Sequence, residues 1–217
     1  MYFPSRHDAG EMLAERLMKY RYEDCAVVAL TASGVTVAEP IAARLHCLLG
    51  LFLSEPVKIP GEDVTLGTVM QDGDFLYNSN LSKSDTDEYY GEFHSYIDAE
   101  KREKFQHINR LLGEGGAVDP RLLREHVVIV VDDGLRTGAK LRAIADYLKP
   151  IKMKRLVLAV PVASVEAVDE MHIVADELHV LSVTENFLAT AHYYDTNDTL
   201  THDQAVEKIN NIILNWR

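Results

Sequence analysis

The sequence predicts an α/β protein built on a doubly wound, mainly parallel sheet with flanking helices. Short apolar runs alternate with amphipathic stretches of helical length, and the runs are apolar throughout, as in strands buried on both faces. Strands that alternate with helices are joined by crossovers and pair in parallel. The chain contains no internal repeat and no Gly/Ser-rich linker. We therefore expect a single domain over residues 1–217, with a small hairpin elaboration.

The helices are indicated by apolar residues spaced three and four positions apart and by residues that cap helix ends. Asp8 is placed to cap the first helix, on which Leu13 and Leu17 share one face. Pro40 is awkward in the second helix because proline lacks an amide proton, so the regular helix should begin near Glu39 or kink. The predicted helices span residues 8–20, 35–46, 84–112, 139–148 and 165–171.

The strands are indicated by short continuous apolar runs that turn residues separate. Val127–Val131 is the strongest run, because all five residues are valine or isoleucine. Residues 67–78 favour a β-hairpin that turns at the Asp72-Gly73 pair, and a tight turn is expected after the first strand at residues 31–34. The remaining predicted strands span residues 26–30, 48–54, 127–131, 156–160 and 177–181.

Charge and composition exclude several classes of partner. The 217 residues include 22 Lys and Arg against 34 Asp and Glu, which gives a formal net charge of −12. Such a chain repels nucleic acids and acidic membrane surfaces. No apolar run approaches the ~20 residues of a membrane span, and the first residues lack the apolar core of a signal peptide. We expect a cytoplasmic protein with a small-molecule substrate, no nucleic acid or membrane partner, and Cys25 and Cys47 as buried, reduced thiols.

The loop after the strongest strand carries the most informative residues. Asp132 and Asp133 end the strand, and Gly134-Leu135-Arg136-Thr137-Gly138 leads into a helix. The two glycines permit backbone conformations that are closed to other residues. Amides at a helix N-terminus stabilise a phosphate, while paired carboxylates accept hydrogen bonds from sugar hydroxyls. We expect one sugar phosphate to span this loop, with its hydroxyls at the aspartates and its phosphate at the helix.

Other interpretations of this loop differ in what they require of its residues. A nucleotide-binding P-loop is disfavoured, because the glycines at 134 and 138 are one residue too close together and Leu141 replaces the Ser or Thr that would hold magnesium. A phospho-acceptor or metal-binding acid pair, as in receiver-like domains, stays open. So does a solvated turn with an ordinary helix cap.

Residues 128–138 resemble the phosphoribosyl diphosphate (PRPP) loop of type I phosphoribosyltransferases: four apolar residues, two acids and a Gly/Thr loop. The resemblance extends to the bacterial group known as predicted phosphoribosyltransferases, and it touches most of the chain. Its other matching segments are Phe3, Arg6, Asp8-Ala9-Gly10, Leu13-Ala14, the stretch from Ala29-Leu30 through Val37-Ala38, Lys58-Ile59, Leu66-Gly67 and residues 158–163.

The resemblance implies a parallel sheet with a small hood, and a transferase that moves phosphoribose from PRPP to a nucleophile the sequence does not identify. It implies Mg²⁺ as cofactor, bound mainly through the substrate with Asp132 and Asp133 as its protein contacts, and it allows a homodimer. Asp132 and Asp133 would hold the ribose hydroxyls, and Lys58 would neutralise the departing diphosphate. Leu135 to Gly138 would cradle the 5-phosphate, with Gly134 as a further substrate-binding residue, and the amides of Thr31-Ala32-Ser33-Gly34 would hold the diphosphate.

Three departures from the family pattern bear on catalysis. The first loop, residues 31–34, carries no positive charge, and the segment from Lys58 to Leu66 is shortened. Arg136 and Lys140 replace small residues. Purine-salvage relatives often carry a carboxylate base at the position of Arg136, which argues against that subclass. The alternative function is therefore a non-catalytic regulatory or sensor domain that binds PRPP or a nucleotide.

Overall fold

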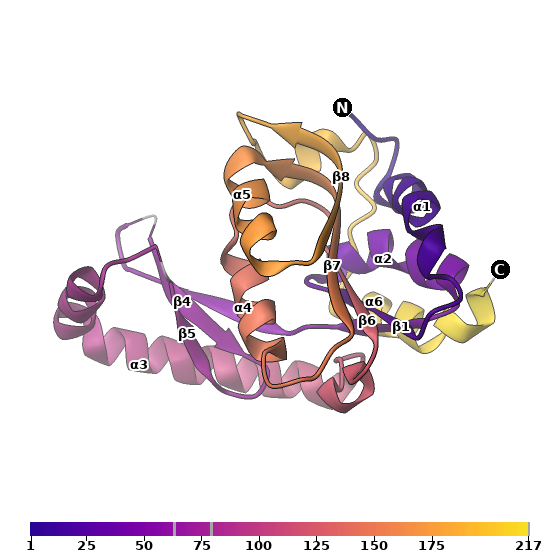
Figure 1. Cartoon of the computed structure of the whole chain (residues 1–217). Helices are drawn as coiled ribbons and strands as arrows, with labels where there is room; N and C mark the ends of the chain where they lie inside the picture. The colour runs from indigo at the N-terminus through magenta and orange to yellow at the C-terminus, as the bar shows by residue number, and fades with distance from the viewer. Residues whose placement is uncertain (63, 79, 217) are drawn as a thin grey trace. The chain divides into compact units, whose positions relative to one another are not determined.

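The computed structural model describes residues 1–62, 64–78 and 80–216 and consists of two compact units (Figure 1). The first unit comprises Met1–Phe52 and Gly116–Arg217, and the second comprises Leu53–Gly115. A hood can form its own compact unit within one domain, so the single domain over residues 1–217 stays a prediction. In the described part of the chain, no helix combines the length and apolar character that crossing a membrane requires.

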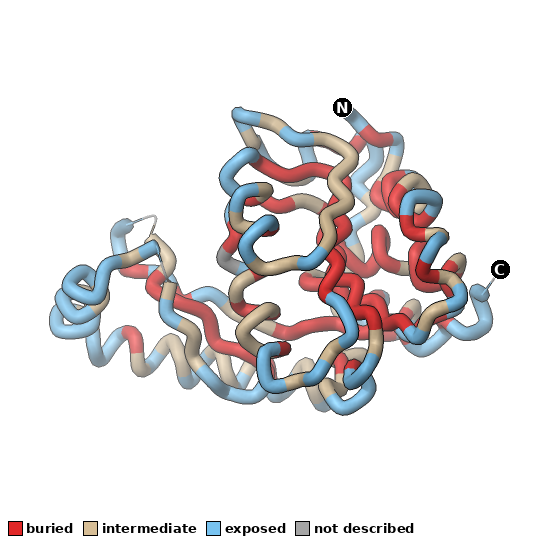
Figure 2. The backbone as a smooth tube through the Cα atoms, viewed as in Figure 1, coloured by how far each residue is buried: buried red, intermediate tan, exposed pale blue. Residues whose placement is uncertain are grey.

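A five-stranded parallel sheet forms the centre of the first unit. Its strands are β1 (Cys25–Ala29), β2 (Leu48–Leu51), β6 (Val127–Val131), β7 (Arg155–Ser164) and β8 (Glu177–Thr184). They lie in the order β2-β1-β6-β7-β8, and every adjacent pair is parallel. All residues of β1 and β6 are buried, as the predicted apolar runs require, and Figure 2 shows this buried centre in red.

Helices cover both faces of this sheet, which confirms the predicted doubly wound class. The α-helices are α1 (Arg6–Leu17), α2 (Ala32–Leu45), α4 (Ala139–Leu148), α5 (Val165–Val174) and α6 (His202–Asn210). Helices α1 and α2 lie on one face and α4 and α5 on the other (Figure 1). Short 3₁₀ helices occupy Met18–Tyr20, Pro120–Leu123, Thr190–Tyr193 and Ile212–Asn215.

Two predicted helix starts are wrong, and in both cases a residue further upstream acts as the cap. The hydroxyl of Ser5 accepts the Asp8 amide at 3.0 Å, so α1 begins before Asp8. Thr31 caps α2 in the same way by accepting the amide of Gly34 at 2.9 Å, so the expected turn at residues 31–34 is a cap followed by the first helical turn. Pro40 consequently lies well inside a regular helix rather than near its start.

The second unit contains an antiparallel sheet and one long helix. Its elements are β3 (Ser54–Lys58), β4 (Thr65–Met70), β5 (Phe75–Tyr77) and α3 (Lys83–Glu114). The hairpin of β4 and β5 is confirmed, and Gly73 at its turn has a φ of +90°, a conformation that favours glycine. The predicted strand at residues 48–54 is in fact divided: β2 ends at Leu51, and β3 begins at Ser54 in the other unit.

Glu177, the first residue of β8, joins the edge of the parallel sheet to the residues that follow α1. Its carboxylate accepts hydrogen bonds from Tyr20 Oη at 2.6 Å, from His179 Nε2 at 2.5 Å and from Lys19 Nζ. Burial alone would raise the pKa of Glu177, but these hydrogen bonds outweigh it and lower the pKa to about 2. The ionised carboxylate therefore stabilises the folded chain.

Replacing Glu177 with Gln is expected to lower the free energy of unfolding at neutral pH by about 2 kcal/mol. Because the folded-state pKa is depressed, this contribution is fully present above the unfolded pKa of about 4.5 and disappears as the pH falls through about 2. Urea unfolding across this pH range measures the difference. The exposed Glu125, which pairs with Lys152 at 3.3 Å, provides the control variant Glu125→Gln, with a change of at most ~1 kcal/mol. A constant gap between Glu177→Gln and the wild-type chain down to the lowest pH would contradict the assignment.

Candidate functional site

The predicted first loop and the acid pair meet at the carboxyl ends of two neighbouring strands. Strands β1 and β6 pair in parallel, with Ala29 opposite Val131, so the segments that follow them leave the same edge of the sheet. Thr31 Oγ1 donates a hydrogen bond of 2.6 Å to Asp132 Oδ1. Ligands of open parallel sheets bind beyond this edge, where neighbouring loops converge. The structure thus brings two of the predicted site segments into direct contact.

Asp132 is fully buried and accepts three hydrogen bonds. Besides Thr31, its Oδ1 accepts the amide of Asp133 at 3.1 Å. Its other oxygen, Oδ2, lies 3.3 Å from Nζ of Lys140, whose side chain is 48% exposed. One carboxylate therefore connects the first loop, the end of β6 and the first turn of α4.

Asp133 is held by a buried arginine that comes from α1. Arg6 Nε donates to Asp133 Oδ2 at 2.8 Å, and its Nη1 lies 3.2 Å from Asp198 Oδ1. The guanidinium lies 4.4 Å from the centre of the Tyr194 ring, and the Tyr194 hydroxyl donates to the backbone carbonyl of Asp133. The start of α1 and the segment from Tyr194 to Asp198 thus meet at the acid pair, and only 2% of Arg6 remains exposed.

Burial and the neighbouring charge of Asp132 raise the pKa of Asp133 to about 6, although Arg6 and Lys140 act in the opposite direction. Asp133 is therefore mostly ionised at neutral pH. Burial also raises the pKa of Tyr194, and the charge of Asp133 adds to the effect, so this hydroxyl remains a hydrogen-bond donor. The pair offers carboxylate oxygens in a setting with little water, where hydrogen bonds to a charged acceptor are strong.

Part of the loop from Gly134 to Gly138 is hydrogen-bonded to strand β7 of the sheet. The Leu135 amide donates to the Val162 carbonyl at 3.0 Å, and the Leu135 carbonyl accepts the Ser164 amide at 2.9 Å. In this conformation the Leu135 amide is used within the sheet. The sequence led us to expect that it would be available to a phosphate. The side chains of Arg136 and Thr137 are exposed. Because α4 follows a glycine cap, the amides of its first turn have no side-chain cap.

The two glycines of this loop are required because a Cβ atom would not fit, and not because of an unusual φ angle. This corrects the expectation that they provide backbone conformations closed to other residues. Gly138 has a φ of −78°, and Gly134 is likewise outside the positive-φ region. A Cβ at Gly138 would lie 2.5 Å from Cβ of Glu170, and one at Gly134 would lie 2.8 Å from Cγ2 of Thr190. Neighbouring side chains therefore pack directly against the loop backbone.

The remaining predicted residues lie in both units. Ala32, Ser33 and Gly34 form the first turn of α2, a position where amides have no partner within the helix. The Gly34 amide is already bound by Thr31, which caps this helix. Lys58 is exposed at the end of β3 in the second unit, and its role at a departing diphosphate stays a prediction.

Sequence reasoning did not identify Arg6, Tyr194 or Asp198 as site residues. One signal for Arg6 was present. Arg6 lies three residues before Ala9 and seven before Leu13. It therefore continues the apolar stripe of α1, and this spacing predicts that it faces the interior. An arginine on a buried stripe needs an acidic partner. The identity of that partner, far away in sequence, had no local signal.

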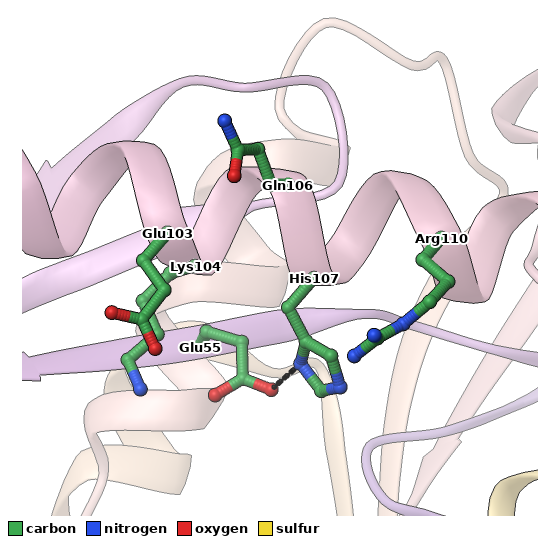
Figure 3. Close-up of a pocket in the computed structure, with 6 residues that line it drawn as sticks. All are labelled: Glu55, Glu103, Lys104, Gln106, His107 and Arg110. Atoms are coloured by element: carbon green, nitrogen blue, oxygen red, sulfur yellow. Dashed lines mark hydrogen bonds and ion pairs between the residues drawn. The ribbon is translucent and has the colours of Figure 1, made fainter.

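The second unit contains a separate charged pocket of about 480 Å³ between β3 and α3 (Figure 3). Glu55 of β3 pairs with His107 Nδ1 of α3 at 3.0 Å, and Lys104 and Arg110 lie on the same stretch of helix. None of the site residues that the sequence predicted lines this pocket. Across residues 1–62, 64–78 and 80–216, no three His, Cys, Asp or Glu side chains are grouped as metal ligands.

Comparison with known proteins identifies relatives over almost the whole chain. The family model of the phosphoribosyl transferase domain matches residues 4–196. The crystal structure of the Thermus thermophilus protein TT1426 is similar along the full length, with 30% identity, a TM-score of 0.72 and coverage of 100% of this chain and 99% of that one. The Aquifex aeolicus protein AQ2163 shares the fold alone, at 12% identity and a TM-score of 0.50, with coverage of 94% of this chain and 81% of that one.

Two proteins of Mycobacterium tuberculosis, from strains CDC 1551 / Oshkosh and ATCC 25618 / H37Rv, carry the provisional name phosphoribosyl transferase. Each is 27% identical over 206 residues, which is 94% of this chain and 45% of the relative. The chain thus spans less than half the length of these curated relatives. The family model covers far more than half of the chain, and TT1426 matches it from end to end. The chain belongs to the phosphoribosyl transferase domain family.

Proposed function

We propose that this chain binds PRPP with Mg²⁺ beyond the carboxyl ends of β1 and β6 and transfers its phosphoribosyl group to a small nucleophile. The observation that carries the proposal is the hydrogen bond of 2.6 Å between Thr31 and Asp132. It joins the loop proposed to hold the diphosphate to the acid pair proposed to hold the ribose. One ligand that carries both groups would span this junction.

Each segment has a chemical role that fits its environment. Asp132 and Asp133 would accept hydrogen bonds from the ribose hydroxyls, which fixes the ring relative to the incoming nucleophile. The uncapped first turn of α4, together with the exposed Thr137 hydroxyl, would hold the 5-phosphate. The first amides of α2 would stabilise the negative charge that develops on the departing diphosphate.

Magnesium fits this site as an ion that enters with its substrate. The described residues provide two adjacent carboxylates at the sheet edge but no group of three metal-binding side chains. Mg²⁺ typically binds through one or two carboxylates together with phosphate oxygens of the substrate. When bound, the ion would supply additional positive charge to the leaving diphosphate. Asp132 and Asp133 are the residues that would contact it.

The Asp132→Asn variant tests the proposal directly. It removes a charge at constant shape, and the loss of one hydrogen bond to a charged group, worth about 1.5–3 kcal/mol, is expected to weaken PRPP binding by roughly ten- to a hundredfold. Isothermal titration calorimetry of the full chain with PRPP and Mg²⁺ measures this change. We favour Asp132 over Asp133, because removing Asp133 would strand the buried charge of Arg6.

Asp146→Asn is the matched control, because it removes the same charge from α4, where Asp146 pairs with Lys149, a side chain that is 75% exposed. It should leave PRPP affinity within about twofold, since pairs open to solvent contribute little. Equal affinity of Asp132→Asn and the wild-type chain, with both folded by circular dichroism, would refute the assignment of the acid pair. Absence of PRPP binding by the wild-type chain would refute the proposal as a whole.

The first loop, residues 31–34, contains no positive charge, which favours a second candidate function: a regulatory domain that binds PRPP without transfer. Release of diphosphate separates the two. An enzyme should release diphosphate from PRPP in the presence of a suitable nucleophile, whereas a sensor should bind PRPP and leave it intact across a panel of nucleobases, amines and ammonia.

A further inference from the structure

The first loop provides no positive side chain to balance the negative charge of the proposed ligand. PRPP carries a 5-phosphate and a diphosphate, and it would bind beside two carboxylates. Residues 31–34 carry no Lys or Arg. Helix N-terminal amides contribute only about half a unit charge, which is less than a diphosphate brings. Mg²⁺ would balance part of this charge, and Lys58, the cation that the sequence suggested for the rest, belongs to the second unit. A cation of the first unit close to Thr31 would balance the charge that remains.

Lys140 lies where such a cation is required. Its Nζ is 3.3 Å from Asp132 Oδ2, and the other oxygen of the same carboxylate accepts the hydroxyl of Thr31 at 2.6 Å. A single carboxylate thus holds the ammonium next to the start of the first loop. Lys140 belongs to the first turn of α4, so the sequence alone associates it with the 5-phosphate loop rather than with residues 31–34.

Arg6, the other cation at the acid pair, is already paired with two carboxylates. Arg6 is 2% exposed and contacts both Asp133 and Asp198 with its guanidinium. The Lys140 side chain is 48% exposed and contacts one carboxylate. Ion pairs of half-exposed lysines contribute little to stability, and the four-carbon stem allows the ammonium to move. Lys140 can exchange a protein partner for a ligand, and Arg6 cannot do so without leaving buried charges unpaired.

We propose that Lys140 is the cation that binds the diphosphate group of the phosphoribosyl ligand and so replaces the positive charge missing from the first loop. The proposal rests on the proposed function and adds a specificity-determining residue to it. Without ligand, the ammonium rests on Asp132. When the ribose hydroxyls donate to Asp132, Lys140 turns to the diphosphate. The proposal places the 5-phosphate at the uncapped amides of α4, which would donate to it directly.

Calorimetric titrations with three probes test this placement. PRPP, inorganic diphosphate and ribose 5-phosphate are each titrated with Mg²⁺ into the wild-type chain and into Lys140→Met, which keeps most of the length of the side chain and removes its charge. We expect PRPP and diphosphate to bind at least about tenfold more weakly to the variant, and ribose 5-phosphate to bind within about twofold of wild type. Lys140→Arg should recover most of the loss.

Lys149→Met is the matched control. It removes the same charge from the other end of α4, where the exposed Lys149 pairs with Asp146, and should change none of the three affinities by more than about twofold. Unchanged PRPP and diphosphate affinity in Lys140→Met would overturn the inference while leaving the proposed function in place. So would an equal loss for ribose 5-phosphate, because it would place Lys140 at the other phosphate. Failure of the wild-type chain to bind any of the three probes would overturn both.

Discussion

Replacing Arg6 with methionine is expected to lower the free energy of unfolding by about 3–5 kcal/mol. The substitution keeps much of the apolar stem and removes a charge that is 2% exposed. It leaves Asp133 buried next to Asp132 without the guanidinium that lies 2.8 Å away, and it removes the contact with Asp198. Breaking a buried pair is costly because the surviving charge stays desolvated.

The pH dependence of Arg6→Met identifies the stranded group. In the variant, burial and the charge of Asp132 act on Asp133 without opposition from Arg6, so the pKa of Asp133 rises above the wild-type value of about 6. A carboxyl with a raised folded-state pKa loses stability as the pH rises from the unfolded pKa to the folded one. The deficit relative to wild type should therefore be larger at about pH 8 than at about pH 5.

Urea unfolding followed by circular dichroism at the two pH values measures this deficit. Arg121→Met is the control, because Arg121 pairs with Asp119 at 2.7 Å while its own side chain is 88% exposed. That variant should lose at most about 1 kcal/mol. A loss in the free energy of unfolding for Arg6→Met that is as small as that of Arg121→Met, or independent of pH, would show that the ion pair with Asp133 does not stabilise the folded chain.

Gly10→Ala is expected to destabilise the chain by about 2–3 kcal/mol, although alanine is normally the better helix former. Gly10 lies in α1 where this helix crosses α2. A Cβ added there would lie 2.3 Å from the Val37 carbonyl oxygen and 2.5 Å from Cγ of Pro40. Neither group can rotate away, because one is backbone and the other belongs to a ring. The two helices would have to separate, and the buried contacts between them would be lost.

Gly91→Ala provides a control of opposite sign. Gly91 lies in α3, and nothing lies within 4 Å of a Cβ added to it. The substitution should stabilise its helix by about 0.5–1 kcal/mol, because alanine loses less backbone entropy than glycine. Midpoints of thermal and urea unfolding for the two variants should therefore shift in opposite directions. A neutral Gly10→Ala would mean that α1 and α2 are packed less closely than the structure indicates.

Several features of the fold follow from local patterns of residues and were predictable before the structure was known. Val127–Val131 is a uniformly apolar run, and it forms the central strand β6. The helix predicted at residues 139–148 has those bounds, and the Asp72-Gly73 turn closes the predicted hairpin. The acid-acid-Gly loop after β6 indicated the family that the comparison then identified. Periodicity and turn chemistry involve only a few neighbouring residues, so they can be recognised in the sequence alone.

The contacts between groups at the site, in contrast, were not predictable from local patterns. Arg6 and Asp133 are 127 residues apart in sequence, and their ion pair exists because α1 packs against β7, the neighbour of β6 in the sheet. The Leu135 amide pairs with the extended β7, so an amide that looked free for a phosphate is used in the sheet. Lys140 appears beside the first loop because β1 and β6 are neighbours. Such contacts depend on chain topology and burial, which no short window of residues encodes.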